Sequence, residues 1–213
     1  KQTTALKKIY QGPANPRTGK PLSAGLPPGS EANPMGLEMY AAPKPPFDGV
    51  FEWAPNWKGP GFDFDRDVDA VRKDLSFSDY SDPHLDGFRK RGGKLLVYSG
   101  WADPIATPGD IVSYYEGVQQ AMGGPAETAK FARLFMLPGM GHCRGGDGPN
   151  SFDALTALAP WVEKGIAPDQ FTASLVVKGQ TVRTRPICAY PKYARWNGTG
   201  STDDAANFAC VTR

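Results

Sequence analysis

Two loops of the sequence carry the residues best suited to acid–base chemistry. Asp103 lies in the run Gly-Trp-Ala-Asp-Pro at 100–104, and His142 lies in the run Pro-Gly-Met-Gly-His-Cys-Arg-Gly-Gly at 138–146. Each run directly follows a short apolar segment that is typical of a buried strand. Held together, an aspartate and a histidine can act as a pair, because the imidazole moves a proton while the carboxylate fixes its tautomer.

The chain order of this pair is informative. An acid after one strand and a histidine after the next form the second half of the Ser…Asp…His order of α/β-hydrolases. No Gly-x-Ser-x-Gly occurs in the 213 residues, however, and Ser99 shares the loop of Asp103, so we assign Ser99 no nucleophilic role. The alternative interpretation makes Asp103 a turn former before proline and His142 a surface residue among glycines.

The elements that must position these loops follow from the apolar pattern. Buried strands are predicted over residues 94–99 and 131–137. Between them, Thr107 followed by Pro108 predicts a helix start, and helical spacing continues to Gly123. The strand–helix–strand order indicates a βαβ unit in a parallel sheet. Ligands gather at the carboxyl ends of such strands, where both loops begin.

Further elements are predicted on both sides of this unit. Helices are expected over residues 1–10, from residue 65 onward, and over 83–90. Strands are expected over 171–178 and 181–187, around a turn at Gly179. A helix is also expected over 151–164, with four apolar residues facing inward: Phe152, Leu155, Leu158 and Val162.

The first part of the chain has a different composition. The chain holds 25 glycines and 21 prolines, and residues 12–61 carry one of them every two or three positions. No long helix or central strand fits such a segment. Because Trp53, Trp57 and other aromatic residues lie there, we expect an ordered irregular segment across a larger body.

Charge and cysteine content exclude some classes of protein. With 24 basic and 22 acidic residues the net charge is +2, which argues against nucleic-acid and membrane partners. No apolar run approaches the roughly 18 residues of a membrane helix. The three cysteines are an odd number, so in an oxidising compartment one is unpaired or pairs outside this chain.

Two acidic or mixed clusters suggest metal sites that we weigh against simpler interpretations. Alternating aspartates at 63, 65, 67 and 69 resemble a calcium loop, but its central glycine and terminal glutamate are missing. Acids at a helix N-terminus explain them as well. His142, Cys143 and Asp147 lack a second close pair of ligands. We therefore predict no metal site in this chain.

Three stretches point to one family: residues 92–104, the run Pro-Gly-Met-Gly-His-Cys at 138–143, and the run Ala-Pro-Trp-Val-Glu-Lys-Gly-Ile-Ala-Pro at 159–168. They resemble the tannase and feruloyl esterase family, and the similarity extends over nearly the whole chain. The resemblance implies the α/β class. Residues 62–213 would be the C-terminal part of an α/β-hydrolase core, with parallel strands and packed helices, and residues 1–61 the irregular Pro/Gly-rich end of a lid.

The resemblance also implies roles for single residues. Asp103 and His142 correspond to the catalytic acid and base, and Cys188 and Cys210 correspond to a disulfide pair. Cys143 would pair with a cysteine next to the nucleophilic serine, in a Gly-Cys-Ser-x-Gly-Gly segment that is absent from this chain. The family's calcium site would also lie upstream, so we expect no cofactor here. Because members are secreted or periplasmic, we expect the same location.

These assignments predict a serine carboxylesterase that hydrolyses esters of aromatic acids through a Ser-His-Asp triad. Its serine would lie outside this chain, so the 213 residues alone are expected to be inactive. The expected partners are an aromatic ester substrate and the N-terminal part of the enzyme as a separate chain. The alternative is a non-catalytic fragment or subunit that docks on a serine-bearing partner chain.

Overall fold

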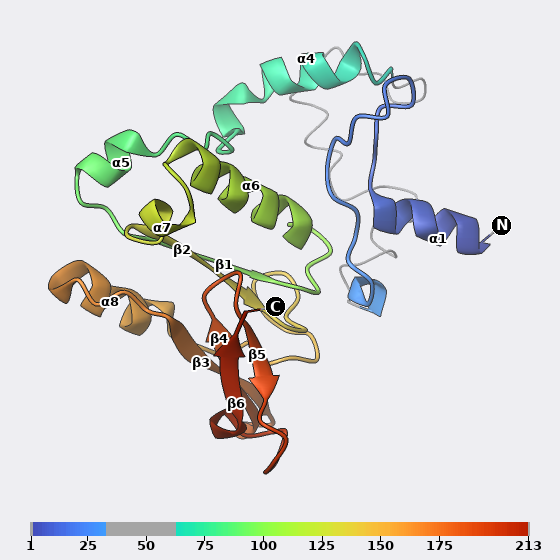
Figure 1. Ribbon diagram of the computed structural model, residues 1–213. Coiled ribbons are helices and arrows are strands. Elements are labelled where there is room, and N and C mark those ends of the chain that lie inside the picture. Colours follow the sequence, from blue (N-terminus) through green and yellow to red (C-terminus); the bar gives the residue numbers. More distant parts are fainter. Residues whose placement is uncertain (1, 33–62, 213) are drawn as a thin grey trace.

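The computed structural model describes residues 2–32 and 63–212, and its elements are drawn in Figure 1. The helices are α1 (Gln2–Gln11), α4 (Asp67–Asp74), α5 (Asp86–Lys90), α6 (Pro108–Ala121), α7 (Pro125–Thr128) and α8 (Ala154–Lys164), with short 3-10 turns η1 (Ser30–Ala32), η2 (Ser76–Ser78) and η3 (Ala205–Asn207). The strands are β1 (Leu95–Gly100), β2 (Ala132–Leu137), β3 (Gln170–Val177), β4 (Gln180–Cys188), β5 (Tyr193–Trp196) and β6 (Phe208–Val211).

The centre of the fold is the parallel pair β1 and β2. Leu95 lies opposite Ala132 and Gly100 lies opposite Leu137, so the two strands end at the same level. The chain between them forms α6 and α7, which confirms the predicted strand–helix–strand unit. Because the strands run in the same direction, the loops that follow both of them start at one edge.

Helix α6 covers one face of this pair (Figure 1). Its Tyr115 and Val118 are buried in a cluster with Leu134 and Met136 of β2. The Tyr115 hydroxyl also donates to the carbonyl of Ala132 at 3.1 Å. Burying four such side chains removes enough apolar area from water to hold the helix on the strands.

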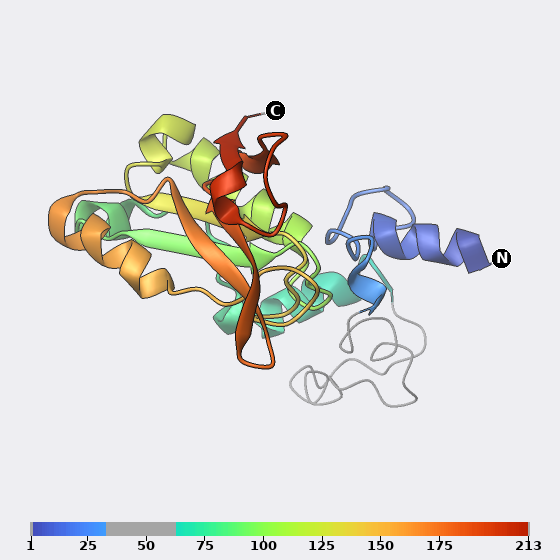
Figure 2. The ribbon, with the colours of Figure 1, turned by 90° about the horizontal axis from the view of Figure 1, so that it is seen from below.

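The opposite face packs against an antiparallel hairpin. Strands β3 and β4 pair around the turn predicted at Gly179, and Figure 2 shows the hairpin crossing the strand pair. The rings of Phe152 and Phe171 stack 5.1 Å apart at this contact. The second buried cluster joins residues of β2, β3, β4 and the histidine loop: Phe135, Leu137, Met140, Ala173 and Ile187.

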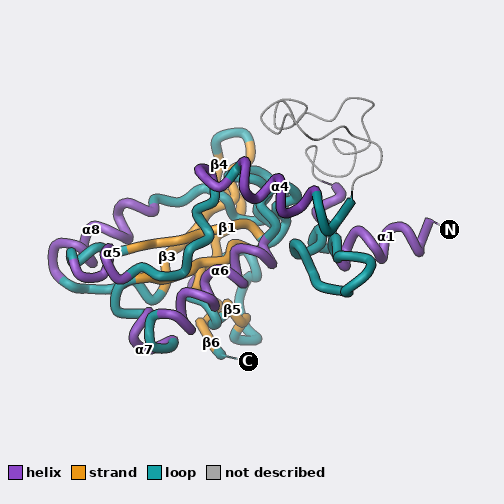
Figure 3. The backbone as a smooth tube through the Cα atoms, turned by 90° about the horizontal axis from the view of Figure 1, so that it is seen from above, coloured by secondary structure: helices purple, strands orange, loops and turns teal. Residues whose placement is uncertain are grey.

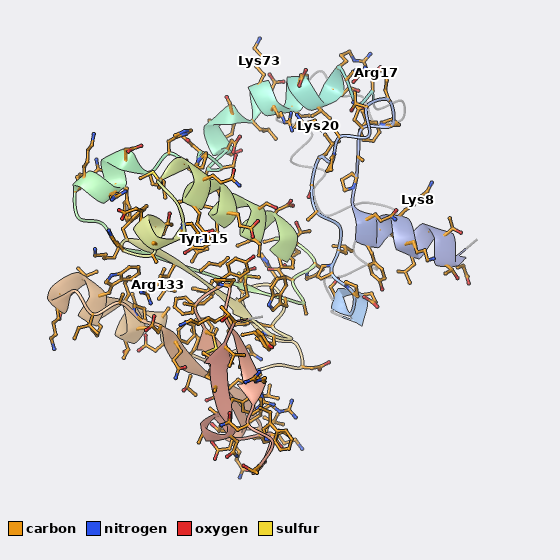
Figure 4. The ribbon with its side chains drawn as sticks, in the orientation of Figure 1. Lys8, Arg17, Lys20, Lys73, Tyr115 and Arg133 are labelled. Atoms are coloured by element: carbon orange, nitrogen blue, oxygen red, sulfur yellow. A yellow bond between two sulfur atoms is a disulfide. The ribbon has the colours of Figure 1, made fainter. Side chains whose placement is uncertain are left out.

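Helix α8 presents a different face from the predicted one. Leu155 and Val162 are 75% and 60% exposed, so their inward assignment was wrong, whereas Trp161 is 2% exposed. The Trp161 ring lies under two cations, 5.6 Å from the guanidinium of Arg133 and 5.7 Å from the ammonium of Lys94. Burial of the largest ring sets the rotation of the helix, and the predicted stripe did not include it. Figure 4 shows Arg133 between β2 and α8.

The C-terminal residues form a second antiparallel pair that the sequence analysis did not predict. Tyr193 of β5 lies opposite Val211 of β6, and Trp196 lies opposite Phe208. A disulfide between Cys188 and Cys210 links the end of β4 to β6. The bond closes a loop of 22 residues, a length for which cross-linking contributes roughly 3 kcal/mol.

The N-terminal segment lies to one side of the strands, as Figures 1 and 3 show. The structure confirms a helix at its start. Asp110 of α6 holds the segment, because its carboxylate accepts from the backbone N–H of Ala24 at 2.7 Å and from the Ser23 hydroxyl. Thr107 is at the N-cap of α6 as predicted, but its hydroxyl donates to Asp110 instead of accepting from the helix backbone.

Residues 33–61 of the predicted lid segment lie outside the described residues. Its interpretation as a covering segment therefore stays a prediction. Within residues 2–32 and 63–212, no helix combines the length and the apolar character that crossing a membrane requires.

The first prediction concerns the contact between the N-terminal segment and the start of α4. Hydrogen bonds from Arg17 and then Asn15 lower the pKa of Asp65 from 3.8 to about 2, and Figure 4 shows Arg17 beside the start of α4. Because the folded-state pKa is depressed, the contact stabilises the fold above about pH 4 and stops doing so as the pH falls through about 2.

Arg17→Ala should raise the pKa of Asp65 toward 3.8, which an NMR titration of the carboxyl carbon measures. Lys8→Ala, on α1, is the control and should leave that pKa unchanged. An Asp65 that still titrates near pH 2 in Arg17→Ala contradicts the assigned cause.

Candidate active site

Asp103 occupies the tight turn that follows β1. Its side chain is buried, with the residue 3% exposed. One carboxylate oxygen, Oδ1, accepts from the backbone N–H groups of Ile105 at 2.8 Å and Ala106 at 3.0 Å. The residue therefore does form the turn that the simpler interpretation expected. Those bonds use one oxygen only, and they fix the direction of the other.

The second carboxylate oxygen faces His142. His142 Nδ1 lies 3.0 Å from Asp103 Oδ2, across 39 positions of sequence. An ionised carboxylate can only accept, so Nδ1–H donates to it and Nε2 of the neutral ring is left as the acceptor. The His142 side chain is 32% exposed whereas that of Asp103 is 4% exposed. The pair thus has a buried carboxylate and a more accessible base, an arrangement suited to taking a proton from a hydroxyl.

Backbone contacts hold the two loops together. The N–H of Ala102 donates to the carbonyl of Met140 at 3.0 Å, and the N–H of Trp101 donates to that of Leu137 at 2.9 Å. Gly100 makes this approach possible, because a Cβ there would lie 2.0 Å from the Met140 carbonyl oxygen. The Met140 side chain is 1% exposed and packs in the core. The histidine loop is therefore anchored two residues before its imidazole.

The glycines of the histidine loop let it fold back on itself. Gly141 donates to the carbonyl of Gly145 at 3.0 Å, and Gly148 donates to that of Gly139 at 3.2 Å. A Cβ on Gly146 would lie 2.1 Å from the Gly139 oxygen. The tight contact with the aspartate loop depends on Gly100, where a Cβ would also lie 2.8 Å from the Gly141 carbonyl oxygen.

The structure also places the other residues that the sequence singled out. Ser99 lies within β1 and is 6% exposed. Cys143 has a free, exposed thiol and a left-handed backbone with φ of 60°. Cys188 and Cys210 are joined to each other. In the described parts of the chain, no three His, Cys, Asp or Glu side chains form a group that could hold a metal ion.

The alternating aspartates near α4 have partners of their own. Asp65 pairs with Arg17 and Asp67 pairs with Arg66. Asp63 Oδ1 accepts from the backbone N–H groups of Asp65 and Arg66. These contacts are those of a helix start.

An apolar cleft of about 560 Å³ opens beside the aspartate loop. Pro104 and Ile105, which directly follow Asp103, form one wall, and Ile9 and Leu26 of the N-terminal segment line it as well. Its volume lies within the roughly 300–1,000 Å³ of small-molecule pockets. Sequence reasoning missed this cleft because the segments that form it are about 80 residues apart.

Comparison with known proteins identifies the family. The family model described as tannase and feruloyl esterase matches residues 35–211, which is most of the chain. The chain belongs to the tannase and feruloyl esterase family. An uncharacterised esterase of Xanthomonas campestris is 35% identical, and the match covers 99% of this chain and 46% of that protein.

Other members of the tannase and feruloyl esterase family agree with this. The mono(2-hydroxyethyl) terephthalate hydrolase of Piscinibacter sakaiensis is 41% identical over 70% of this chain and 26% of its own length. The crystal structure of feruloyl esterase B from Aspergillus oryzae superposes with a TM-score of 0.85 and 26% identity, over 99% of this chain and 45% of that one. The structural neighbours are esterases of the α/β-hydrolase type.

The chain thus spans less than half the length of these relatives. It contains the strand ends with the aspartate and histidine loops, together with the elements that follow them along the chain.

The close approach of the two loops gives the second prediction. Gly100→Ala should destabilise the chain by about 1–3 kcal/mol, because the new methyl group overlaps the Met140 carbonyl. Urea denaturation measures the change. Gly117→Ala in α6 is the matched control, since its Cβ would meet only a Pro83 side-chain atom at 3.8 Å and alanine favours a helix. Equal stability of Gly100→Ala and wild type would show that the contact does not constrain the loops.

Proposed function

We propose that the protein to which this chain belongs hydrolyses carboxylic esters of aromatic acids. Asp103 and His142 would form two members of a Ser-His-Asp triad, with the serine outside these 213 residues. The observation that carries the proposal is the 3.0 Å contact between His142 Nδ1 and Asp103 Oδ2, at the carboxyl ends of neighbouring parallel strands. Family membership supports the reaction class, because the named relatives are esterases.

The proposed mechanism uses the geometry of the pair directly. His142 Nε2 takes the proton of the serine hydroxyl as its oxygen attacks the ester carbonyl, and the protonated ring then gives that proton to the leaving alcohol. Asp103 stabilises the imidazolium through the Nδ1 hydrogen bond. Water, activated by the same nitrogen, releases the acid from the acyl-enzyme.

The cleft beside Asp103 supports an aromatic acyl group as substrate. Its walls are mostly apolar, and its polar lining residues Ser23, Thr107 and Asp110 already bond to one another, since both hydroxyls donate to the Asp110 carboxylate. A planar ring therefore fits its chemistry better than a charged or polyhydroxylated group. The Cys188–Cys210 disulfide supports a secreted or periplasmic location, since such bonds persist in oxidising compartments.

The second candidate function is a non-catalytic fragment or subunit that docks on a serine-bearing chain. The exposed thiol of Cys143, next to His142, is the observation that favours it. A bond from this thiol to a second chain would hold the partner against the histidine loop.

The third prediction tests the proposed reaction. The 213-residue chain alone should not hydrolyse methyl ferulate, whereas a longer protein that includes an upstream Gly-Cys-Ser-x-Gly-Gly segment should. In that longer protein Asp103→Asn should lower kcat by a factor on the order of 10⁴. Tyr80→Ala is the control and should leave kcat unchanged, since Tyr80 is 85% exposed and does not line the cleft beside Asp103. Hydrolysis by the short chain that is lost in His142→Ala would refute the placement of the serine.

The fourth prediction separates the two candidate functions through Cys143. Material purified with this thiol blocked at lysis should show, by intact mass, whether a second chain is attached. For the 213 residues produced alone, the esterase proposal predicts a free Cys143 thiol and the Cys188–Cys210 bridge, because the cysteine expected to pair with Cys143 lies outside this chain. Reduction should then change the mass only by opening that bridge. A larger species that reductant separates would favour the docking subunit instead.

A further inference from the structure

A second groove lies at the ends of the central strands, and the reaction proposed above does not use it. Its volume is about 410 Å³, and it shares no lining residue with the cleft beside Asp103. Trp101 and Pro138 line it from the ends of β1 and β2, and residues 190–194 line it from the segment that leads into β5. Trp101 lies two positions before Asp103, and Pro138 lies four before His142.

The walls of this groove are held in place before any ligand arrives. The Tyr190 ring meets the Tyr115 ring edge to face at 6.2 Å, its hydroxyl donates to Glu116 at 2.7 Å, and its backbone N–H donates to Leu134. Cys188 in the wall is bound to Cys210 of β6. A site with fixed walls loses little freedom when it binds, so a small ligand can bind there with useful affinity.

Three of the residues that line the groove are aromatic. Trp101, Tyr190 and Tyr193 line it, and Trp101 and Tyr193 are each 41% exposed. Large aromatic faces beside a concave surface suit a flat ring, because stacked and edge-to-face pairs gain energy beyond simple burial. The first requirement for the ligand is therefore a planar aromatic group.

The charge of the lining adds the second requirement. Lys192 is the charged side chain among the described lining residues, which include no carboxylate and no amide side chain. A sugar would need several such polar partners for its hydroxyl groups. A single ammonium instead complements one carboxylate, through a charge-assisted hydrogen bond.

We propose that this groove binds a planar aromatic carboxylate, with the ring against Trp101 and Tyr193 and the carboxylate on the Lys192 ammonium. The choice of ferulate as the probe rests on the proposed function, since that reaction releases such an acid. The argument from the residues that line the groove is independent of the proposed function. A bound acid contacts the starts of both loops that carry Asp103 and His142.

Isothermal titration of the 213-residue chain with ferulate tests the proposal. The His142→Ala variant is the background, so that the neutral methyl ester can serve as a comparison without being hydrolysed. We expect ferulate to bind about tenfold more tightly than methyl ferulate, because the ester cannot pair with Lys192. Lys192→Gln should weaken ferulate binding by about the same factor and leave the methyl ester unaffected.

Matched variants locate the site. Trp101→Ala should weaken both ligands, whereas Trp196→Ala, equally exposed at 41% but outside the groove, should weaken neither. Lys164→Gln is the charge control. It removes a lysine at the end of α8 that does not line the groove, and it should leave ferulate binding unchanged.

Absence of ferulate binding at millimolar concentration, equal affinity for acid and ester, or full binding by Lys192→Gln would each overturn the proposal. These titrations measure binding and not hydrolysis. An absence of ferulate binding would therefore leave the esterase proposal unaffected. Conversely, an absence of esterase activity would leave the proposal for this groove to be tested by binding alone.

Discussion

The hydrogen bond from the Ala102 N–H to the Met140 carbonyl is the contact on which the candidate site depends. It joins the two loops directly before their functional side chains, and it exists only because Gly100 carries no Cβ to fill the same space. The buried Met140 side chain ties this junction to the core. As a result, two paired strands hold the 3.0 Å contact between Asp103 and His142 in place. Catalysis by such a pair requires positions that are fixed in this way.

The layers around the strand pair serve that same geometry. Helix α6 covers one face, and the β3–β4 hairpin with α8 covers the other, so β2 is buried along most of its length and β1 is buried at its end, at Ser99 and Gly100. Trp161 adds a specific contact, because its ring packs under Arg133 and Lys94 at the side of the sheet that α8 faces. The disulfide then fixes the C-terminal strands to β4. These strands support the wall of the aromatic groove.

The family relationship connects the contact between Asp103 and His142 with ester hydrolysis. In a family of esterases, the described chain places an aspartate and a histidine in contact on adjoining loops. It spans less than half the length of its relatives. Two hollows flank the loops, one apolar beside Asp103 and one aromatic with a lysine beside Trp101. The proposed reaction needs a site for an aromatic acyl group, and the cleft beside Asp103 matches it. The groove beside Trp101 matches the aromatic acid that the reaction would release.

Local pattern in the sequence was sufficient for the central unit. The apolar runs before Gly100 and Pro138, the helix start at Thr107 and the Asp…His order are short-range features, and they predicted the parallel strands and the candidate pair. The motifs at 138–143 and 159–168 also indicated the family. Only the tertiary structure decided which face of α8 is buried, that β5 and β6 pair, and that Gly100 is the glycine that permits the loop contact. The physical reason is that these features depend on residues distant in the chain. The buried Trp161 ring packs against Arg133, β5 forms by pairing with β6, and the effect of Gly100 comes from the nearby Met140 carbonyl.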